Sequence, residues 1–389
     1  MIYISAVGMI NALGNDTNEI AANLTCGVAP GMQPRAGWLR GVPEAVLGGV
    51  DATLPTIPDR FAAHRSRNNQ LLLAALAQIR PQVDEAITRF GHDRVAVVLG
   101  TSTSGLDEGD IHVDRTLNGH ASTDWQYPQQ ELGDPSRFLS HWLALDGPAF
   151  TLSTACSSSA RAIISGRRLI DAGLADVAIV GGADTLSRMP VNGFHSLESL
   201  SPTRCQPFAR DRSGITIGEG AALMLLTREP QSIALLGVGE SSDAYHISAP
   251  HPQGEGAIRA IAMALNDAGI SADDVGYINL HGTATPLNDR VESQVVQALF
   301  GDHVPCSSTK HLTGHTLGAA GITEAAIAML ILQRDLPLPP QDFTLSPRDP
   351  ALADCGLITT AQRLERPVIL SNSFAFGGNN ASILLGRCS

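Results

Sequence analysis

Aromatic residues and charges are both scarce in this chain. Aromatic side chains make up 4% and charged side chains 16% of the 389 residues. Hydrophobic residues nevertheless reach 43%, so the apolar content is mainly aliphatic and excludes an intrinsically disordered chain. Basic residues number 26 against 38 acidic ones, which gives a net charge of −12, and no basic block occurs. Because nucleic-acid-binding proteins usually carry the opposite charge, we do not expect nucleic acid as a partner.

Paired cysteines and long apolar segments are missing as well. The six cysteines form no CxxC pair and are scattered over the chain: Cys26, Cys156, Cys205, Cys306, Cys355 and Cys388. This pattern is typical of a reduced cytoplasmic protein and argues against a disulfide framework or a zinc site. No apolar run approaches the roughly 18–20 residues that span a bilayer. The apolar N-terminus lacks the basic start and cleavage site of a signal peptide, so we predict a first strand there and a cytoplasmic protein without a membrane span.

Short apolar runs alternate with stretches of helical period along the chain. The expected strands are Val95–Gly100, Val177–Gly181, Ala221–Leu226, Ile233–Val238, Val275–Leu280 and Val368–Leu370. The expected helices between them include Asn69–Arg80, Ala160–Ala172 and Glu255–Ala268. This alternation predicts a layered α/β fold, and the length suits one large domain or two tightly fused ones. The best boundary is Thr227–Gln231, which divides the chain into halves 1–230 and 231–389.

The two halves show a faint internal similarity. VAVVLGTSTSG near residue 100 resembles VGYINLHGTATP near residue 281, and FTLSTACSSSA near residue 156 resembles PCSSTKHLTGH near residue 310. In the first pair, each buried strand runs into a loop that contains Gly-Thr. A duplication would explain the similarity, and chance likeness between strand–loop segments is the alternative.

Cys156 is the first candidate for chemistry. In PAFTLSTACSSSARAI it follows a β-prone run and precedes a helical stretch, which places its thiol at a helix N-terminus. Unpaired amides and the positive end of the helix dipole favour thiolate there. The small neighbours Ala155, Ser157 and Ser158 leave room for a substrate. The alternative is the usual fate of a free cysteine, a buried and inert thiol.

Two histidines follow glycine-rich strand ends in the second half. His281 in YINLHGTATPLND comes directly after a buried strand, where a side chain is well placed to enter a cleft. His315 lies in SSTKHLTGHTLGAAG, before an Ala-rich helix that contains Glu324. A buried carboxylate at Glu324 would need a cation, for which Lys310 is the nearest candidate by sequence. The alternative for a lone histidine is a local hydrogen bond in a turn, and we expect His311 to be solvated rather than catalytic.

Two aromatic residues stand beside a Gly-Gly turn near the C-terminus. NSFAFGGNNASILL places Phe374 and Phe376 there, between two strands. Their rings and backbone border a pocket, or they contribute ordinary core packing and a hairpin. A metal held by Cys156, His281 and His315 is disfavoured, because no short ligand spacing supports it.

Taken together, these segments resemble the β-ketoacyl-acyl carrier protein synthases of the thiolase superfamily, of the elongating Cys–His–His type. The resemblance runs in order from SAVGMINALGND through TACSSS, HGTATPLND and TGHTLGAAG to NSFAFGGNN, and it covers essentially the whole chain. It implies the thiolase-like fold, an α/β fold of two duplicated halves stacked in α-β-α-β-α layers. It also implies dimerisation through the N-terminal half.

The resemblance implies a decarboxylative Claisen condensation. Cys156 would accept the acyl group, while His281 and His315 would hold a malonyl-type extender and favour loss of CO₂. Backbone amides of Cys156 and Phe376 would form an oxyanion hole. Further implied roles are support of the histidines by Lys310 and Glu324, gating by Phe376, lining of the acyl pocket by Phe374 and Phe194, and contact with the phosphopantetheine arm by Thr283 and Thr285.

The resemblance implies no nucleotide, metal or flavin, since the phosphopantetheine belongs to the partner acyl carrier protein. Carrier proteins are acidic, so we expect a local basic patch, with Arg60, Arg65 and Arg67 as candidates. A solvated helix face is the alternative for these three residues. The other partner is a second copy of the chain or a chain-length-factor-like subunit.

Some segments depart from the housekeeping enzymes of the family. FGGNNAS has Asn379 where those enzymes usually carry threonine, and the segment GDIHVDRTLNGHASTDWQYPQQ matches them poorly. These differences indicate a specialised pathway, for which the aryl polyene group is our leading hypothesis. A degradative thiolase would carry a second cysteine near Phe376, and a starter-condensing synthase would carry asparagine in place of His315. The alternative from a different class is a catalytically silent chain-length-factor-like subunit, against which Cys156 argues.

Overall fold

The computed structural model describes residues 1–120 and 124–388. The elements of the first half are β1 (Ile2–Asn11), α1 (Thr17–Cys26), β2 (Met32–Ala36), β3 (Glu44–Gly48), α2 (Arg67–Phe90), β4 (Val95–Gly100), α3 (Leu106–Leu117), α4 (Asp134–Trp142), β5 (Ala149–Leu152), α5 (Ser158–Asp171), β6 (Val177–Asp184), α6 (Arg188–Ser196) and β7 (Gly220–Thr227). Short 3₁₀ turns η1 (Asp59–His64) and η2 (Tyr127–Gln130) interrupt its loops. Every strand and helix that the sequence predicts in this half is present.

The second half contains β8 (Ile233–Ser242), α7 (Glu255–Ala268), β9 (Tyr277–Asn279), α8 (Pro286–Phe300), β10 (Cys306–Ser307), α9 (Lys310–Thr313), α10 (Ala320–Arg334), β11 (Val368–Ala375) and β12 (Asn379–Arg387). The 3₁₀ turns η3 (Ala272–Asp274), η4 (Leu317–Ala319) and η5 (Phe376–Gly378) lie between these elements. The predicted strands and helices of this half are confirmed too.

The large sheet repeats one topology in both halves. Its strand order is β10-β9-β11-β12-β8-β1-β7-β6-β4-β5, with β1 and β8 antiparallel at the centre. We number the strands of this sheet separately in each half, without β2 and β3, which form a sheet of their own. From each outer edge to the centre, both halves then show the order third, second, fourth, fifth and first strand. The parallel and antiparallel pairs of the two halves also correspond. The predicted duplication is therefore confirmed. The chain passes from the first repeat to the second between Thr227 and Ile233. The domain limits 1–230 and 231–389 stay a prediction, because the two repeats share one sheet.

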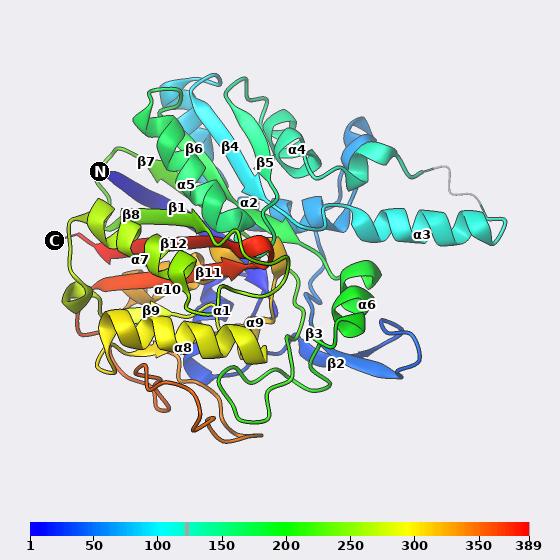
Figure 1. Ribbon diagram of the computed structural model, residues 1–389. Helices are drawn as coiled ribbons and strands as arrows, with labels where there is room; N and C mark the ends of the chain where they lie inside the picture. Colours follow the sequence, from blue (N-terminus) through cyan, green and yellow to red (C-terminus); the bar gives the residue numbers. More distant parts are fainter. Residues whose placement is uncertain (121–123, 389) are drawn as a thin grey trace.

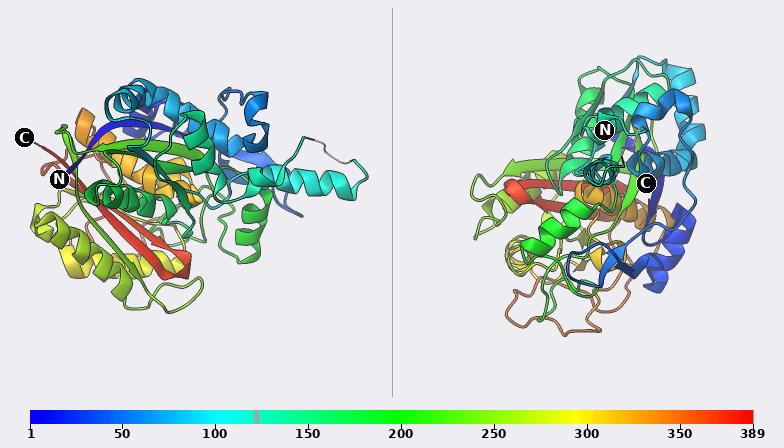
Figure 2. Two further views of the ribbon diagram at one scale, coloured as in Figure 1. Left: turned by 90° about the horizontal axis from the view of Figure 1, so that it is seen from above. Right: turned by 90° about the vertical axis from the view of Figure 1, so that its right-hand side faces the viewer.

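Helices form three layers around the two sheet halves (Figures 1 and 2). Helices α2 and α4 pack on the outer face of the first half, and α7 and α8 pack on the outer face of the second. Helices α5 and α10 contact each other between the sheet halves, where the largest apolar cluster lies. This arrangement is the α-β-α-β-α layering expected from the sequence, and it brings the N-terminal ends of α5 and α10 into the centre of the molecule.

The segment that contains helix α10 is more apolar than we expected from the sequence. The segment Leu317–Arg334 is long and apolar enough to cross a membrane by length and composition, contrary to the expectation that no such run exists. However, 89% of the segment is buried inside the protein. A helix covered by sheets on two sides must be apolar all round, so the protein core accounts for its composition.

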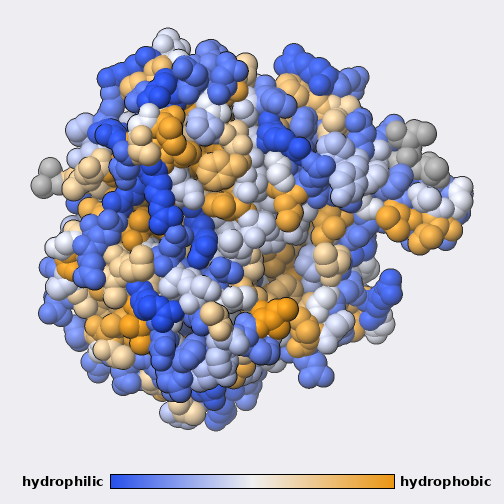
Figure 3. All heavy atoms as spheres, turned by 45° about the horizontal axis from the view of Figure 1, so that its top comes forward, coloured by the Kyte–Doolittle hydropathy of each residue, from blue (hydrophilic) through white to orange (hydrophobic). Residues whose placement is uncertain are grey.

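Helix α3 projects from the body on the side away from both termini (Figures 1 and 2). We call this helix the arm. Its contacts with other elements include those with η2 and α6. Apolar side chains collect on its free surface (Figure 3), and the exposed fraction rises from 45% at Ile111 through 55% at Val113 to 82% at Leu117. Such a helix leaves its apolar face without cover from the described part of its own chain.

Candidate active site

Cys156 lies in a sharp turn between β5 and α5. Ala155 before it adopts a left-handed conformation with φ of +53°, a strained geometry for a residue with a side chain. The turn is held by the hydroxyl of Ser157, which donates to the carbonyl of Thr154 at 2.8 Å, and by Ser158, which donates to Ala155 at 2.6 Å. The serines after the cysteine thus stabilise the turn, and the thiol lies at the N-terminal end of α5, as predicted.

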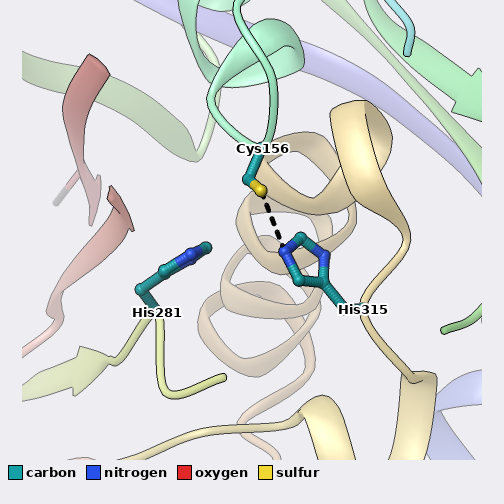
Figure 4. A group of neighbouring side chains, drawn as sticks. All are labelled: Cys156, His281 and His315. Carbon is teal, nitrogen blue, oxygen red and sulfur yellow. Dashed lines mark hydrogen bonds between the residues drawn. The ribbon is translucent and has the colours of Figure 1, made fainter. Parts of the chain in front are cut away.

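His315 approaches the thiol from the second half of the chain. Its Nε2 lies 3.0 Å from Sγ of Cys156 (Figure 4). The backbone N–H of Leu317 donates to its Nδ1 at 3.1 Å, so in a neutral ring the proton is on Nε2. The main chain of His315 is held by Thr216 and Gly218, through bonds of 2.7 and 3.0 Å. Residues of the first half therefore fix the position of this histidine relative to the thiol.

His281 lies beside them at the end of β9. Its ring stands at 89° to that of His315, with the centroids 5.5 Å apart (Figure 4). The ammonium of Lys310 lies 3.5 Å from Nδ1 and donates to the carbonyl of His281 at 2.5 Å. Since the ammonium has only protons to offer, Nδ1 of His281 is an acceptor and its Nε2 carries the proton. Both histidines thus carry a donor N–H on Nε2.

The histidines are neutral in this environment. Burial lowers the pKa of His281 well below its ordinary value, and the charge of Lys310 and the ring of His315 lower that pKa further. Burial followed by Lys310 has the same effect on the pKa of His315. Lys310 forms a buried ion pair with Glu324, whose pKa rises to about 7 because burial outweighs the attraction of the lysine. Lys310 therefore both orients His281 and disfavours its protonation.

The thiol of Cys156 is protonated at rest. Burial raises its pKa to about 11, while Lys310 and the backbone amides of Phe376 and Cys156 act in the opposite direction. Position at a helix N-terminus favours a thiolate, as the sequence predicts, but desolvation is the larger effect. The two amides still matter, because groups that stabilise negative charge near Sγ also suit an oxyanion formed there.

The three side chains also have the composition of a metal site. The ligand atoms of Cys156, His281 and His315 lie within 4.8 Å of one another, and within the described residues this is the group with that property. A metal would need the lone pair of each Nε2. Because Leu317 and Lys310 direct both protons onto Nε2, the surroundings favour hydrogen-bond donation over coordination.

A cavity of about 220 Å³ opens onto Cys156, His281 and His315. Its lining includes every substrate-binding residue that the sequence predicts: Phe194, Thr283, Thr285, Phe374 and Phe376. The rings of Phe194 and Phe376 lie 5.7 Å apart, and Phe376 begins the turn η5 between β11 and β12. Gly377 and Gly378 in this turn have φ of +79° and +71°, which explains why two glycines follow the aromatic residue.

Comparison with known proteins places these features in a family. The model of the β-ketoacyl synthase N-terminal domain matches residues 36–232, and that of the C-terminal domain matches residues 233–343. A 3-oxoacyl-[acyl-carrier-protein] synthase 2 of Rhizobium meliloti (strain 1021) is 40% identical over 332 residues, which are 79% of this chain and 76% of the relative. The chain belongs to the β-ketoacyl synthase family.

Two solved structures are also similar to this synthase. The ketosynthase ApeO of Xenorhabdus doucetiae, solved in complex with its chain length factor ApeC, is 67% identical with a TM-score of 0.98, covering 100% of this chain and 98% of that one. The ishigamide ketosynthase/chain length factor is 26% identical with a TM-score of 0.88, over 100% and 99% of the chains. The resemblance and the thiolase-like fold inferred from the sequence are therefore confirmed.

The synthase is a 3-oxoacyl-[acyl-carrier-protein] synthase, an acyltransferase that elongates acyl chains. Its Cys–His–His site is intact. This excludes the silent subunit, which would lack Cys156, and the starter-condensing type, which would lack His315. A degradative thiolase is excluded in the same way, because Phe376 and Gly377 occupy the place of its second cysteine.

The three arginines that the sequence suggests for carrier-protein binding lie in and after η1, and none lines the cavity. Arg60 is exposed, with its guanidinium 5.1 Å from the centre of the Phe61 ring. Arg65 is paired with Asp59 at 2.7 Å on the surface. Arg67 binds the buried Glu219 through two bonds of 2.6 and 2.9 Å. The structure therefore gives Arg67 a structural contact within the synthase.

The structure also shows supporting residues that we did not predict. Glu292 of α8 accepts the backbone N–H groups of His281 and Gly282, both at 2.7 Å. Asp289, one turn earlier, accepts from Phe208 at 2.8 Å and Ala284 at 3.2 Å. The sequence contains a pattern that could have predicted them: two acidic residues three positions apart, on one face of the helix that follows the His281 motif. Burial raises the pKa of Glu292 to about 8 and that of Asp289 to about 6.

His311 corrects an expectation. We predicted a solvated side chain, but only 4% of the residue is exposed, and burial lowers its pKa to about 4. Its Nδ1 lies 3.2 Å from the carbonyl of Ser308, and the residue is absent from the cavity lining. His311 is buried because it lies in the short helix α9, all four residues of which are buried.

Proposed function

We propose that Cys156, His281 and His315 perform a decarboxylative condensation between a cysteine-bound acyl group and a malonyl-type extender on an acyl carrier protein. The observation that carries this proposal is the 3.0 Å approach of Nε2 of His315 to Sγ of Cys156, beside a second histidine whose Nε2 also bears a proton. A nucleophile next to two neutral donors suits a reaction that forms first an acyl thioester and then an enolate.

In the loading step, Sγ of Cys156 attacks the thioester carbonyl of the acyl carrier protein. The backbone amides of Cys156 and Phe376 hold the oxyanion of the tetrahedral state. The carbon–sulfur bond to phosphopantetheine breaks, and the proton of Cys156 leaves with the released thiol. Because Nε2 of His315 already carries a proton, this ring does not act as the base of the loading step.

In the condensation step, the thioester oxygen of the extender accepts hydrogen bonds from Nε2 of His281 and His315. Loss of CO₂ leaves its electron pair in an enolate, whose negative oxygen the two donors stabilise. The enolate carbon attacks the acyl carbonyl, and Cys156 leaves as thiolate. Neutral rings suit this role, since the lowered pKa values keep both histidines as uncharged donors over the working pH range.

The remaining cavity residues guide the two substrates. We assign Lys310 and Glu324 to the orientation of His281, because the ammonium bridges the carboxylate, the carbonyl and Nδ1 of that histidine. Thr283 and Thr285, whose hydroxyl oxygens are 2.9 Å apart, contact the phosphopantetheine arm. Phe376 gates the cavity, while Phe374 and Phe194 line the acyl chain. Their common position around one cavity supports these roles.

For the carrier protein we propose docking on Arg60 and Arg65, with Arg67 as the third member of the patch. Arg60 offers an exposed guanidinium group to an acidic partner, and Arg65 is exposed beside it although it is paired with Asp59 on the surface. Arg67 is 39% exposed but bound to Glu219, so we expect it to contribute less.

For the second subunit we propose a chain-length-factor-like partner rather than a second copy. The similar ketosynthase ApeO was solved with its chain length factor. In this synthase β5 is the edge strand of the large sheet on the side of the first half, and Phe150 on it is 37% exposed. The arm carries the exposed apolar side chains of Val113 and Leu117. An unpaired strand edge and an apolar helix face are both suited to pairing with another chain.

We further propose a cytoplasmic synthase of the aryl polyene group, built of halves 1–230 and 231–389. Supporting the pathway are Asn379 in the C-terminal motif and the similarity to a ketosynthase that works with a chain length factor. The use of free cysteines, several of them buried, supports a reducing compartment.

The proposed function is tested by intact-protein mass spectrometry. The synthase, with and without its partner subunit, is mixed with acyl- and malonyl-loaded carrier proteins. We expect an acyl adduct on Cys156 and a β-keto product two carbons longer on the carrier. Cys156→Ala should give neither. His281→Ala and His315→Ala should load acyl groups but lose decarboxylation by about a hundredfold or more, the usual effect of removing an oxyanion donor.

Unchanged condensation by Cys156→Ala would refute the mechanism, and full turnover by either histidine variant would remove that residue from it. Product formation by the synthase alone would contradict the need for a partner subunit. Linear, unsaturated and aryl acyl donors are compared in parallel, and preference for a linear saturated donor would contradict the pathway assignment.

A further inference from the structure

Asp184 is a buried carboxylate at the end of β6 that the reaction steps above do not use. No part of its side chain is exposed. Its Oδ1 accepts four hydrogen bonds, from the hydroxyl of Thr101 at 2.8 Å, the amide of Ser102 at 2.8 Å, and the amide and hydroxyl of Thr103, both at 2.7 Å. Its Oδ2 accepts the backbone N–H of Ala319 at 3.0 Å.

The surroundings of Asp184 contain donors but no cation. Within residues 1–120 and 124–388, no arginine, lysine or histidine forms an ion pair with it. A carboxylate removed from water is costly unless hydrogen bonds replace its hydration. The five donors do so, and hydrogen bonds to a charged acceptor are short and strong. The segments that supply the donors are consequently held in one arrangement around Asp184.

One of these segments is the loop that orients His315. Ala319 ends the turn η4, which begins at Leu317. The N–H of Leu317 holds Nδ1 of His315, and Leu317 has a left-handed conformation with φ of +50°, which is strained for a branched side chain. A strained turn persists only when its surroundings hold it. The N–H of Ala319 is shared between the carbonyl of Thr316, at 2.9 Å inside the turn, and Oδ2 of Asp184, at 3.0 Å. The bond to Asp184 links the end of this turn to the first half of the chain.

The other segment supports the nucleophile. Thr101, Ser102 and Thr103 follow β4, which ends at Gly100. A Cβ at Gly100 would lie 2.3 Å from the amide of Ser159, so the end of β4 packs directly against the first turn of α5, next to Cys156. Asp184 thus connects the support of the thiol in one half with the histidine loop of the other.

We propose that Asp184 is a positioning residue of the condensation step, which fixes the turn after His315 and thereby keeps Nε2–H of His315 aimed at the reacting groups. This inference rests on the role proposed above for His315. Asp184 does not line the cavity, and its connection to His315 runs through the turn Leu317–Ala319. It belongs to the first half of the chain, so the geometry of the histidine depends on a residue distant from both histidine motifs.

Asp184→Asn is the most specific test, because it changes one end of the network. The amide oxygen can still accept from Thr101, Ser102 and Thr103, but the NH₂ group then faces the N–H of Ala319, donor against donor. We expect decarboxylation of malonyl carrier protein and overall condensation to fall about tenfold to a hundredfold in kcat, less than for loss of the whole donor. We expect KM and the rate of acyl loading on Cys156 to change less than about threefold.

Three controls separate positioning from a general effect on the fold. Asp134→Asn changes another fully buried carboxylate, which binds His64 and Asn69 rather than the histidine loops, and should lower neither half-reaction. Asp184→Asn in a His315→Ala background should cause no further loss of decarboxylation, since two residues that act through one group are not additive. Thr103→Val removes one donor to Oδ1 and should lower decarboxylation more than loading, by a smaller factor.

The proposal would be overturned if Asp184→Asn lowered acyl loading and decarboxylation by the same factor. If Asp184→Asn does not fold, the same result in Thr103→Val would overturn it. So would an additional loss in the His315→Ala background. Failure of the wild-type synthase to decarboxylate the extender would refute the proposed function itself, which distinguishes the two results.

Discussion

At the scale of single residues, the site works by desolvation. The same burial that lowers the pKa of both histidines raises that of Cys156 to about 11. A neutral donor is useful to the reaction, whereas a protonated thiol is not. The amides of Phe376 and Cys156 and the charge of Lys310 compensate in part, since each favours negative charge at Sγ. Exclusion of water therefore keeps the thiol protonated at rest, but it also strengthens the hydrogen bonds that the two histidines donate.

The pKa of Cys156 gives a pH prediction. With a folded-state value near 11, the thiolate fraction and the alkylation rate by iodoacetamide should rise about tenfold per pH unit between pH 7 and 10. Lys310 lowers this pKa, so Lys310→Met should slow alkylation at every pH. Rates are followed by mass spectrometry, with the exposed Cys26 as internal reference. A rate that levels off below pH 8 would show that the helix N-terminus outweighs burial.

The ion pair between Lys310 and Glu324 makes a stability prediction. Both side chains are almost fully buried. At pH 8, above the pKa of about 7 of Glu324, Lys310→Met forces this buried carboxyl group to stay charged without its cation or to take up a proton. The free energy of unfolding should therefore fall by about 3–5 kcal/mol. Lys310→Met combined with Glu324→Gln removes the unpaired charge and should recover part of that loss. Urea unfolding measures both, and equal loss in the single and double variants would contradict this account.

At the scale of elements, helix ends and short loops carry the chemistry while buried helices hold them. Helix α5 presents Cys156, α10 begins just after the turn that orients His315, and α8 supplies Glu292 to the His281 loop. The two central helices are surrounded by sheet on both sides, so their ends cannot shift independently. The packing of α5 on α10 thereby helps to set the separation between the thiol and His315.

Helix α8 provides the prediction at this scale. Glu292→Gln keeps one acceptor for the amides of His281 and Gly282 but turns an NH₂ group toward the other. We expect kcat of decarboxylation to fall about tenfold through misplacement of His281, with KM changed little. Exposed Glu255 at the start of α7 provides a matched control, and Glu255→Gln should leave both parameters unchanged. A rise in KM at constant kcat would show instead that Glu292 acts on substrate binding.

At the scale of the whole molecule, the apolar side chains of the arm are exposed and β5 lies at the edge of the large sheet. Leu117→Asp on the arm places a charge on a face that we propose the partner subunit covers. The variant should bind the partner at least about tenfold more weakly, since a buried unpaired charge is costly. Light scattering and titration calorimetry measure this. Leu345→Asp, at an exposed apolar residue outside the arm, serves as control, and equal affinity of Leu117→Asp and wild type would exclude the arm from the interface.

Much of this protein follows from its sequence by itself. The period of apolar residues predicts the strands and helices, because burial of one face or of a whole run is a local property. The motifs around Cys156, His281 and His315 predict the three reacting side chains, and the internal similarity predicts the duplication. These features depend on short segments, in which neighbouring residues contain the information.

Only the tertiary structure decided the rest. The proton positions on both histidines depend on Leu317 and Lys310, and the support of their loops depends on Glu292 and Asp184. The apolar length of α10 proved to be a consequence of its central place between two sheets. The pKa of Cys156 likewise depends on how deeply packing buries the thiol. Such effects arise from contacts between residues far apart in the chain, whose distances no local pattern encodes.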